Sequence, residues 1–221
     1  MIGLILASGY SRKLRMMGIN QSATVKVRWE GNTEPLIVTQ IRMLKNLTSE
    51  VFVSVGWMRD EVVGAVTKSH QKVVIFEDRH IRGAGLVWQQ LLNEIGERNE
   101  ILSVECSRLH GLIDMLEFAK TAGWNAVGMV NGRGRYRYTV DGAYVKSIGA
   151  KLEEGMTSSG VYLLDGAKVC ACPIDYSDEN KEFSGDVVVK YILNTEKVRA
   201  IPITQYLDVE EDEGIRKVMV R

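Results

Sequence analysis

Short apolar runs alternate with helical patterns along this 221-residue chain, and this alternation constrains the fold more than any other feature. The runs IGLILA, EVFVSVG, KVVIFED and EILSVEC are each typical of a buried strand. Between them, helices are predicted over 35–47, 59–70 and 85–95, the first with Leu36, Ile37, Ile41 and Leu44 on one face. Strands joined by helical crossovers predict an α/β fold with three layers, in which a mostly parallel central sheet carries helices on both faces.

The segment 125–151 has a different pattern, because short β-prone runs alternate there with glycine turns. We expect it to add a small antiparallel edge to a Rossmann-like sheet. The run TSSGVYLLD predicts one more strand, and 186–203 predicts a helix followed by a strand. No repeat of about 20 to 50 residues and no low-complexity linker divides the chain, so residues 1–221 are predicted to form a single domain.

Charge and hydropathy argue against two classes of partner. The chain has 28 Lys and Arg residues against 28 Asp and Glu residues, so no overall positive charge favours nucleic acid. No apolar run approaches the roughly 20 residues of a membrane helix, and the first apolar segment is too short for a signal peptide. We therefore expect a cytoplasmic protein that binds neither nucleic acid nor membrane.

The cysteines and histidines carry no metal-binding pattern. Three cysteines without C-x-x-C spacing indicate neither a disulfide framework nor a zinc site, and the histidines lack the paired spacing of a metal motif. These residues are Cys106, Cys170 and Cys172, and His70, His80 and His110. We expect reduced, mostly buried thiols and surface or satisfied core histidines.

The first predicted strand runs directly into a turn of small residues, Ala7-Ser8-Gly9-Tyr10-Ser11, which is followed by the cations Arg12, Lys13 and Arg15. Ligands of open α/β sheets bind beyond the carboxyl ends of the strands. Small residues let backbone N–H groups approach a phosphate, and the cations neutralise its charge. The turn matches neither the dinucleotide motif nor the P-loop. A plain loop with solvated basic residues therefore stays open beside a triphosphate site.

Motifs along almost the whole chain, in order, resemble the sugar-phosphate nucleotidyltransferase family, the GT-A-like pyrophosphorylases. LASGYSRKL is similar to the family's L-A-A-G-x-G-[ST]-R-[LM], Val25-Lys26 to its Pro-Lys pair, and EGNTEPLIVTQIRML to the segment that opens the next helix. EVFVSVGWMRDEV, HIRGAGLVWQQLL and TSSGVYLLD resemble its second strand, its later glycine loop and its late strand. ITQYLDVEEDEGIRKV is similar to its W-x-D-v-g-T ending.

The resemblance implies a GT-A type fold and a reaction. An NMP group passes from a nucleoside triphosphate to a sugar-, polyol- or choline-type phosphate, and pyrophosphate is released. No protein nucleophile is needed, because such catalysis consists of positioning and charge neutralisation. The resemblance assigns nucleotide binding to Ala7, Ser8, Gly9, Ser11, Arg12, Gly83 and Gly85. It assigns catalytic roles to the lysines Lys13, Lys26 and Lys151. The partners are then the triphosphate and a phosphorylated small molecule, and a homo-oligomer is left open.

The same resemblance implies Mg²⁺ as cofactor, held by Asp208 with Glu105 or a water on Ser107. Here the chain departs from the family, because Cys106-Ser107 stands where the family has Gly-Asp. Glu105 lies two residues earlier on the same face of a strand and offers a replacement carboxylate. Lys13 in place of the family's arginine keeps the charge but not the bidentate fork. A second function class is therefore a catalytically weakened homologue that binds a nucleotide or a partner without turnover.

Simpler roles compete with these assignments. Lys26 fits an exposed strand lysine, Gly83 and Gly85 fit a plain turn, Glu105 fits an ion pair with Arg108, and Asp208 fits a helix cap. The arginines and tyrosines of NGRGRYRY fit a solvated hairpin better than a nucleic-acid surface. Trp88 and Trp124 stand at apolar positions and are predicted to lie in the core.

Overall fold

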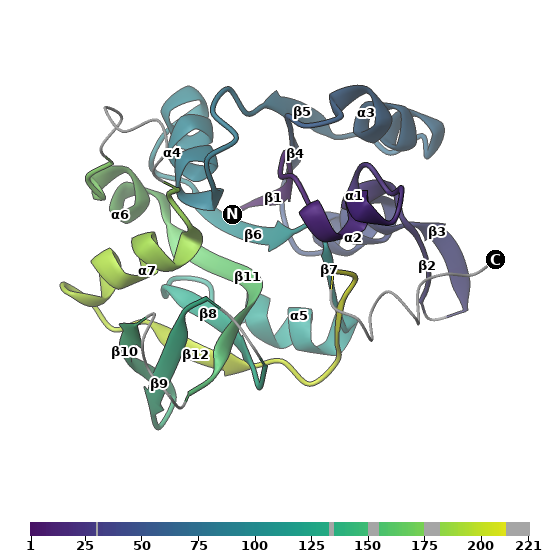
Figure 1. Ribbon diagram of the computed structural model, residues 1–221. Helices are drawn as coiled ribbons and strands as arrows, with labels where there is room; N and C mark the ends of the chain where they lie inside the picture. Colours follow the sequence, from purple (N-terminus) through teal and green to yellow (C-terminus); the bar gives the residue numbers. More distant parts are fainter. Residues whose placement is uncertain (30, 133–134, 150–154, 175–181, 211–221) are drawn as a thin grey trace.

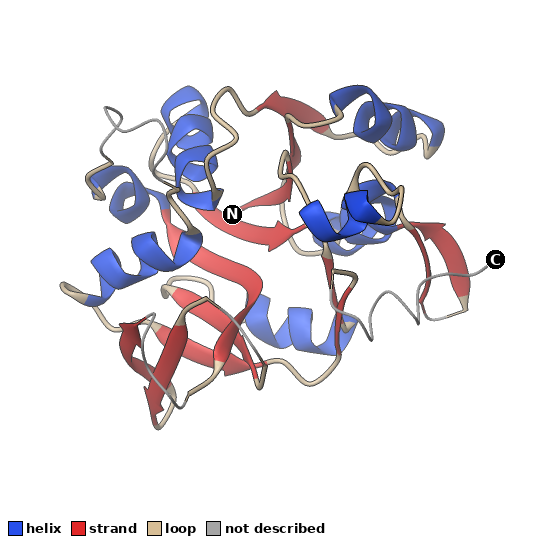
Figure 2. Cartoon of the chain, in the orientation of Figure 1, coloured by secondary structure: helices blue, strands red, loops and turns tan. Residues whose placement is uncertain are grey.

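The computed structural model describes residues 1–29, 31–132, 135–149, 155–174 and 182–210. A nine-stranded sheet with the order β5-β4-β1-β6-β11-β8-β12-β10-β9 forms its centre (Figures 1 and 2). Its strands are β1 (Ile2–Ala7), β4 (Val51–Val55), β5 (Val74–Glu77), β6 (Glu100–Glu105), β8 (Ala126–Val130), β9 (Arg137–Asp141), β10 (Tyr144–Gly149), β11 (Thr157–Asp165) and β12 (Arg199–Pro202). Two small antiparallel pairs flank it, β2 (Lys26–Trp29) with β3 (Asn32–Pro35) and β7 (Arg108–His110) with β13 (Tyr206–Asp208).

The sheet is mostly parallel, as predicted, and it is mixed in its second half. Strands β5, β4, β1 and β6 run parallel to one another, and β8 runs parallel to β12. The hairpin of β9 and β10 makes the predicted antiparallel edge. A second antiparallel strand, β11, lies in the middle of the sheet between β6 and β8. The sequence predicted β11 as a strand, but its direction depends on neighbours far away in the chain.

Helices cover both faces of the sheet (Figure 2). One apolar core lies under α2 (Leu36–Lys45), α3 (Arg59–Lys68) and α5 (Leu112–Ala119), and a second lies under α4 (Ala84–Ile95), α6 (Gly166–Ala171) and α7 (Gly185–Leu193). The side chains of β1 alternate between the two, with Leu4 in one and Ile5 in the other. The short helix α1 (Arg12–Met16) and the 3₁₀ turn η1 (Ser22–Thr24) follow β1.

Several predictions about single residues can be compared with this core. The four apolar residues predicted on one face of the helix over 35–47 are buried in α2, and Trp88 is fully buried in α4. The prediction for Trp124 is wrong, because its side chain is 47% exposed and stacks with the Arg199 guanidinium, 4.8 Å from the ring centre. In the described part of the chain, no helix combines the length and the apolar character that crossing a bilayer requires.

Candidate functional site

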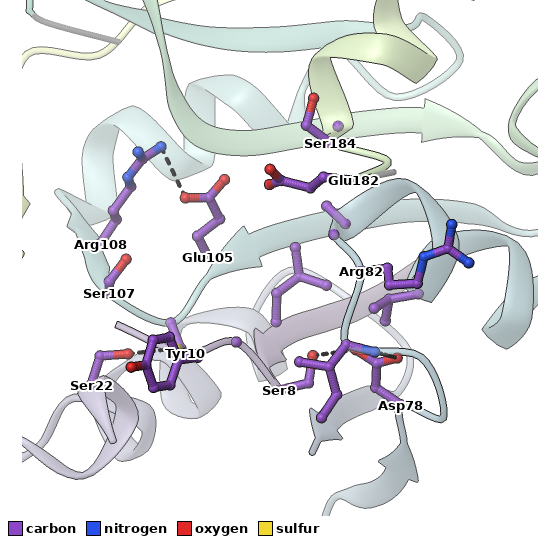
Figure 3. A pocket seen from close by; sticks show the side chains of 18 of the residues that line it. Ser8, Tyr10, Ser22, Asp78, Arg82, Glu105, Ser107, Arg108, Glu182 and Ser184 are labelled. Carbon is purple, nitrogen blue, oxygen red and sulfur yellow. Dashed lines mark hydrogen bonds and ion pairs between the residues drawn. The ribbon is translucent and has the colours of Figure 1, made fainter. Parts of the chain in front are cut away.

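A cavity of about 470 Å³ opens beyond the carboxyl ends of β1 and β6 (Figure 3). Four segments that are far apart in the sequence line it. They are the turn Ser8–Tyr10 after β1, the segment Ile81–Ala84 that leads into α4, the end of β6 with Glu105–Arg108, and Glu182 with Ser184–Asp186 at the start of α7. This is the edge of an α/β sheet at which ligands bind, so the cavity is the candidate functional site.

The turn after β1 is attached to the loop after β5. The Ser8 hydroxyl donates a hydrogen bond of 2.6 Å to Oδ2 of Asp78, which is buried. Oδ1 of Asp78 accepts the backbone N–H groups of His80 and Ile81, at 3.0 and 2.9 Å. Oxygens of Asp78 therefore fix two walls of the cavity relative to each other. The preceding carbonyl, that of Ala7, accepts a hydrogen bond of 3.1 Å from the side chain of Gln21.

Only some of the residues that were predicted to hold phosphates line the cavity. Ser8 and Gly9 line the cavity. Ser11 does not, and its hydroxyl caps α1 by accepting the Leu14 N–H at 3.2 Å. Arg12 and Lys13 follow on α1 and are exposed, and neither is among the residues that line the cavity.

The other two predicted lysines do not join the cavity either. Lys26 is exposed on β2, at the position that pairs with Pro35 of β3, and it is not among the lining residues. This matches the simpler role of an exposed strand lysine. Lys151 lies outside the described residues.

The glycine loop before α4 is in contact with the backbone that leads into α7. The Phe183 N–H donates to the Arg82 carbonyl at 2.7 Å, and the Gly85 N–H donates to the Phe183 carbonyl at 2.9 Å. Gly83 has a φ of 107°, and a Cβ there would lie 2.5 Å from the Phe183 oxygen. A Cβ on Gly85 would lie 2.8 Å from Cγ2 of Val188. Both glycines are thus required by packing within the chain, although Gly83 also lines the cavity.

Arg108 stands between the two carboxylates that the resemblance assigned to a metal. Its Nη1 lies 3.0 Å from Oε2 of Glu105, and its Nε donates to Oδ2 of Asp208 at 3.0 Å. Figure 3 shows the first of these ion pairs at the wall of the cavity. The Tyr206 hydroxyl donates a longer bond of 3.2 Å to the same Asp208 oxygen, and Oδ1 accepts the Glu210 N–H at 2.9 Å. Ser107 lines the cavity beside this cluster.

A bulge in β11 makes room for the arginine. The pairing of β11 with β8 shifts between Ser158 and Tyr162, and Gly160 within the bulge has a φ of 80°. A Cβ on Gly160 would lie 2.7 Å from Cδ and 2.8 Å from Nη1 of Arg108. The Ser158 carbonyl completes the cradle and accepts from Nη1 at 3.4 Å. The chain is therefore shaped around the Arg108 guanidinium.

This arrangement does not fit a resident divalent metal. An oxygen of Glu105 and both oxygens of Asp208 already take hydrogen bonds or an ion pair from the protein. Within residues 1–210, as far as they are described, no cluster of three or more His, Cys, Asp and Glu side chains could hold a metal ion. The Arg108 guanidinium already lies between the two carboxylates, where a metal ion would otherwise lie.

The cavity is rich in carboxylates, and burial weakens their charge. Asp78, Glu105, Glu182, Asp186 and Glu210 line it, against the cations Arg82 and Arg108. Burial raises the pKa of Glu105 and of Asp186. Burial, with Asp208 and Glu105 nearby, raises the pKa of Glu210 to about 7. Burial lowers the pKa of Arg108, but Glu105, Tyr206, Asp208 and Tyr162 together outweigh burial and raise this pKa, so the guanidinium stays charged.

Sequence reasoning missed several of these lining residues. Asp78 follows a predicted strand directly, and its place at a strand end was an available signal. Glu182, Ser184 and Asp186 had no signal, because they reach the cavity through the contact of Phe183 with the glycine loop. The ion pair of Glu105 with Arg108 was weighed as an alternative, whereas the bond from Arg108 to Asp208 joins residues 100 positions apart.

Comparison with solved structures identifies the fold. The chain superposes on the CTP:phosphocholine cytidylyltransferase LicC from Streptococcus pneumoniae with a TM-score of 0.77 and 17% identity, over 98% of this chain and 96% of that one. This chain has the nucleotidyltransferase fold. It is also similar to the inositol-1-phosphate CTP transferase from T. maritima, with a TM-score of 0.72 and 15% identity over 99% and 96% of the two chains.

A putative glucose-1-phosphate thymidylyltransferase from Bacillus anthracis shares the nucleotidyltransferase fold as well. Its TM-score is 0.77 and its identity 13%, over 99% of this chain and 94% of that one. No family model and no curated protein matches the sequence. The structural similarity extends over almost the whole length of these chains and agrees with the predicted architecture. At sequence identities of 13% to 17% it shows a shared fold.

Proposed function

We propose that this protein is a nucleotidyltransferase that moves an NMP group from a nucleoside triphosphate to a sugar-, polyol- or choline-type phosphate. The observation that carries the proposal is the cavity beyond β1 and β6, where the turn Ser8–Gly9 faces the glycine loop at Gly83. Backbone N–H groups at such a turn suit phosphates. The three similar structures are named as NMP-transferring enzymes, which supports the same reaction class.

Two features of the cavity favour a polar ligand. The hydroxyl of Ser184 is buried at the cavity wall and has no hydrogen-bond partner among the described residues. A buried hydroxyl without a partner costs free energy, which a ligand donor or acceptor would recover. Arg108 also lines the cavity and offers a fixed positive charge. A base with exocyclic polar groups and a phosphate chain would use both.

The proposed reaction needs no covalent intermediate. An oxygen of the acceptor phosphate attacks the α-phosphorus, the bond from that phosphorus to its bridging oxygen breaks, and pyrophosphate leaves. Ser8, Gly9 and Gly83 would hold the nucleotide, and Arg108 would neutralise charge on its phosphates. Arg12, Lys13 and Lys26 stay proposed phosphate contacts from the resemblance, and they would have to reach the ligand from outside the lining residues.

A specific observation favours the second function class. Arg108 pairs with both Glu105 and Asp208, the carboxylates that the resemblance assigns to Mg²⁺. The divalent cofactor and its ligand Ser107 therefore stay predictions that this arrangement does not support. The alternative is a catalytically weakened homologue that binds a nucleotide or a partner with little or no turnover. A cytoplasmic location and a homo-oligomer likewise stay predictions.

Gly9 offers a direct test of the proposed function. Nothing lies within 4 Å of a Cβ placed on Gly9, which lines the cavity, so Gly9→Val adds bulk toward a ligand without a clash in the chain. Gly64→Val is the matched control, because its Cβ also meets nothing within 4 Å and Gly64 lies on α3. We expect thermal stabilisation of wild type and Gly64→Val by one of the common NTPs, with at least tenfold weaker binding by Gly9→Val.

The same proteins separate the two function classes. Pyrophosphate release is measured with the NTP that stabilises the protein and with phosphorylated sugars, polyols and choline as acceptors. Release that depends on the acceptor supports the transferase. Binding without release at any acceptor supports the weakened homologue. No stabilisation by any NTP contradicts the transferase and leaves the weakened homologue only as a partner-binding protein.

A further inference from the structure

The positive charge between Glu105 and Asp208 comes from a side chain, Arg108. We propose that Arg108 takes the place of a divalent metal in the cavity, so that the protein excludes free metal ions from Glu105 and Asp208 and binds nucleoside phosphates without them. The inference about metal exclusion stands by itself. The inference about phosphate binding rests on the proposed function.

The guanidinium is held where two carboxylates converge. Nε and Nη1 bind Asp208 and Glu105, each at 3.0 Å, from two different strand ends. Asp208 is 8% exposed and the Arg108 side chain 24% exposed, so solvent competes little for this pair. A metal ion would have to displace the guanidinium from both partners and leave it unpaired in a partly buried place, which is costly.

The backbone is shaped to keep the arginine there. Gly160 adopts a left-handed conformation, which L side chains rarely take, and its missing Cβ leaves the space that Arg108 fills. His110, two residues beyond Arg108 on β7, binds the Ser159 carbonyl at 2.9 Å and holds the bulge from its other side. The bulge in β11, Gly160 and the buried ring of His110 thus all help to hold the Arg108 side chain in place.

Arg108 also has binding capacity left. Its contacts use Nε and Nη1, and in the described part of the chain the N–H groups of Nη2 have no partner. The residue lines the cavity, so these donors are available to an anionic ligand. A guanidinium binds a phosphate through paired N–H donors. It carries one charge where Mg²⁺ carries two, so we expect moderate affinity that does not depend on metal.

The first experiment measures Mn²⁺ binding without any nucleotide, by the loss of the free Mn²⁺ signal in electron paramagnetic resonance. Wild type should bind no Mn²⁺ at this site, and Arg108→Met, which frees both carboxylates, should bind it at least tenfold more tightly than wild type. Arg108→Lys keeps the charge and should behave as wild type. The control is Arg135→Met, which frees only Glu182 in the same cavity and should not gain Mn²⁺.

Two results of this experiment would overturn the proposal. One is Mn²⁺ binding by wild type as tight as by Arg108→Met. The other is a folded Arg108→Met protein that still binds no Mn²⁺. If Arg108→Met does not fold, the wild-type titration decides, and saturable stoichiometric binding that the Asp208→Asn substitution removes would overturn it.

The second experiment compares NTP stabilisation of wild type in EDTA and in Mg²⁺. We expect the melting temperature to rise equally in both. A rise seen only with Mg²⁺ would overturn the metal-free mode of binding. Absence of stabilisation in both buffers would reject the proposed function and the phosphate half of this inference, while the Mn²⁺ titration still decides whether Arg108 excludes metal.

Discussion

Two groups of charges lie near the cavity, and they are built in opposite ways. The basic turn, defined as Arg12, Lys13 and Arg15, is exposed on α1, and Arg15 lies against the rings of Tyr10 and Trp57 at 5.4 and 5.2 Å. The inner cluster, defined as Glu105, Arg108 and Asp208, is partly buried, and its guanidinium pairs with both carboxylates. The difference teaches that a fixed charge at this site comes from residues that the fold itself holds, whereas the basic turn presents its charges on an exposed helix.

The largest effect is expected from breaking the inner cluster. Asp208→Ala removes one partner of a buried ion pair and should lower the free energy of unfolding by about 3 kcal/mol. Asp60→Ala is the control, because the Asp60 side chain is 96% exposed beside Arg59 and its pair is worth less than about 1 kcal/mol. Urea unfolding measures both. Equal losses would show that the inner cluster is no stronger than a surface pair.

A smaller effect is expected from filling the space beside Arg108. Gly160→Ala should destabilise the protein by about 2 kcal/mol, because strain at positive φ adds to the clash with Arg108. Gly142→Ala shares the positive φ, at 58°, but its Cβ meets nothing within 4 Å, so it should show only the strain. The difference between the two urea midpoints isolates the contact. Equal urea midpoints would mean that the space left at Gly160 is not needed to accommodate Arg108.

The pH dependence tests the buried carboxyl next to the inner cluster. The pKa of Glu210 is raised from 4.5 to about 7 by burial and by Asp208, so the folded state holds this proton more tightly than the unfolded state. The resulting stability is present below pH 4.5 and is lost as the pH rises toward about 7. Glu210→Gln should remove a wild-type decline of about 2 kcal/mol between pH 5 and 8.

The control for this titration is an exposed glutamate outside the inner cluster. Glu117→Gln changes an exposed glutamate of α5, whose side chain is 59% exposed, and should keep the wild-type slope. Burial lowers the pKa of His110 to about 4, so this histidine costs stability as the pH falls from 6.5 toward 4, the opposite direction. Subtracting the pH dependence of the unfolding free energy of Glu210→Gln from that of the wild type separates the contribution of Glu210 from that of His110. A slope that Glu210→Gln leaves unchanged would contradict the assignment.

The smallest effect on the fold is expected at the basic turn. Lys13→Ala and Arg12→Ala should leave the melting temperature unchanged, because both side chains are exposed. If the basic turn reaches the phosphates, each change should weaken binding of the stabilising NTP by about threefold to tenfold, or about 1 kcal/mol. Arg59→Ala on α3 is the control in the calorimetric titration. Unchanged affinity in both variants would confine phosphate recognition to the cavity lining.

Periodic features of the sequence predicted most of the fold. The alternation of apolar runs and helical faces gave β1, β4, β5 and β6 with α2, α3 and α4, because local spacing decides which side chains can be buried. It missed α5 and could not orient β11, whose direction is set by β6 and β8. Such pairing is a property of contacts that are distant in sequence.

The site was predictable only where it lies at strand ends. Ser8, Gly9, Glu105 and Ser107 were expected at the carboxyl edge and do line the cavity. Gly83 and Gly85 of the glycine loop were expected to lie against the nucleotide, and a close neighbour of both in the structure is the chain's own Phe183 carbonyl. Side chains arriving from the last third of the chain, such as Glu182 and Ser184, had no local signature.

The contact between the glycine loop and Phe183 has a kinetic consequence. It joins backbone that lies as far apart in sequence as Arg108 and Asp208, which are 100 residues apart, and both contacts close the same cavity. Loop closure over such distances is slow and must wait for the intervening strands. We therefore expect the cavity to be completed late in folding, because two of the contacts that close it join segments far apart in the sequence.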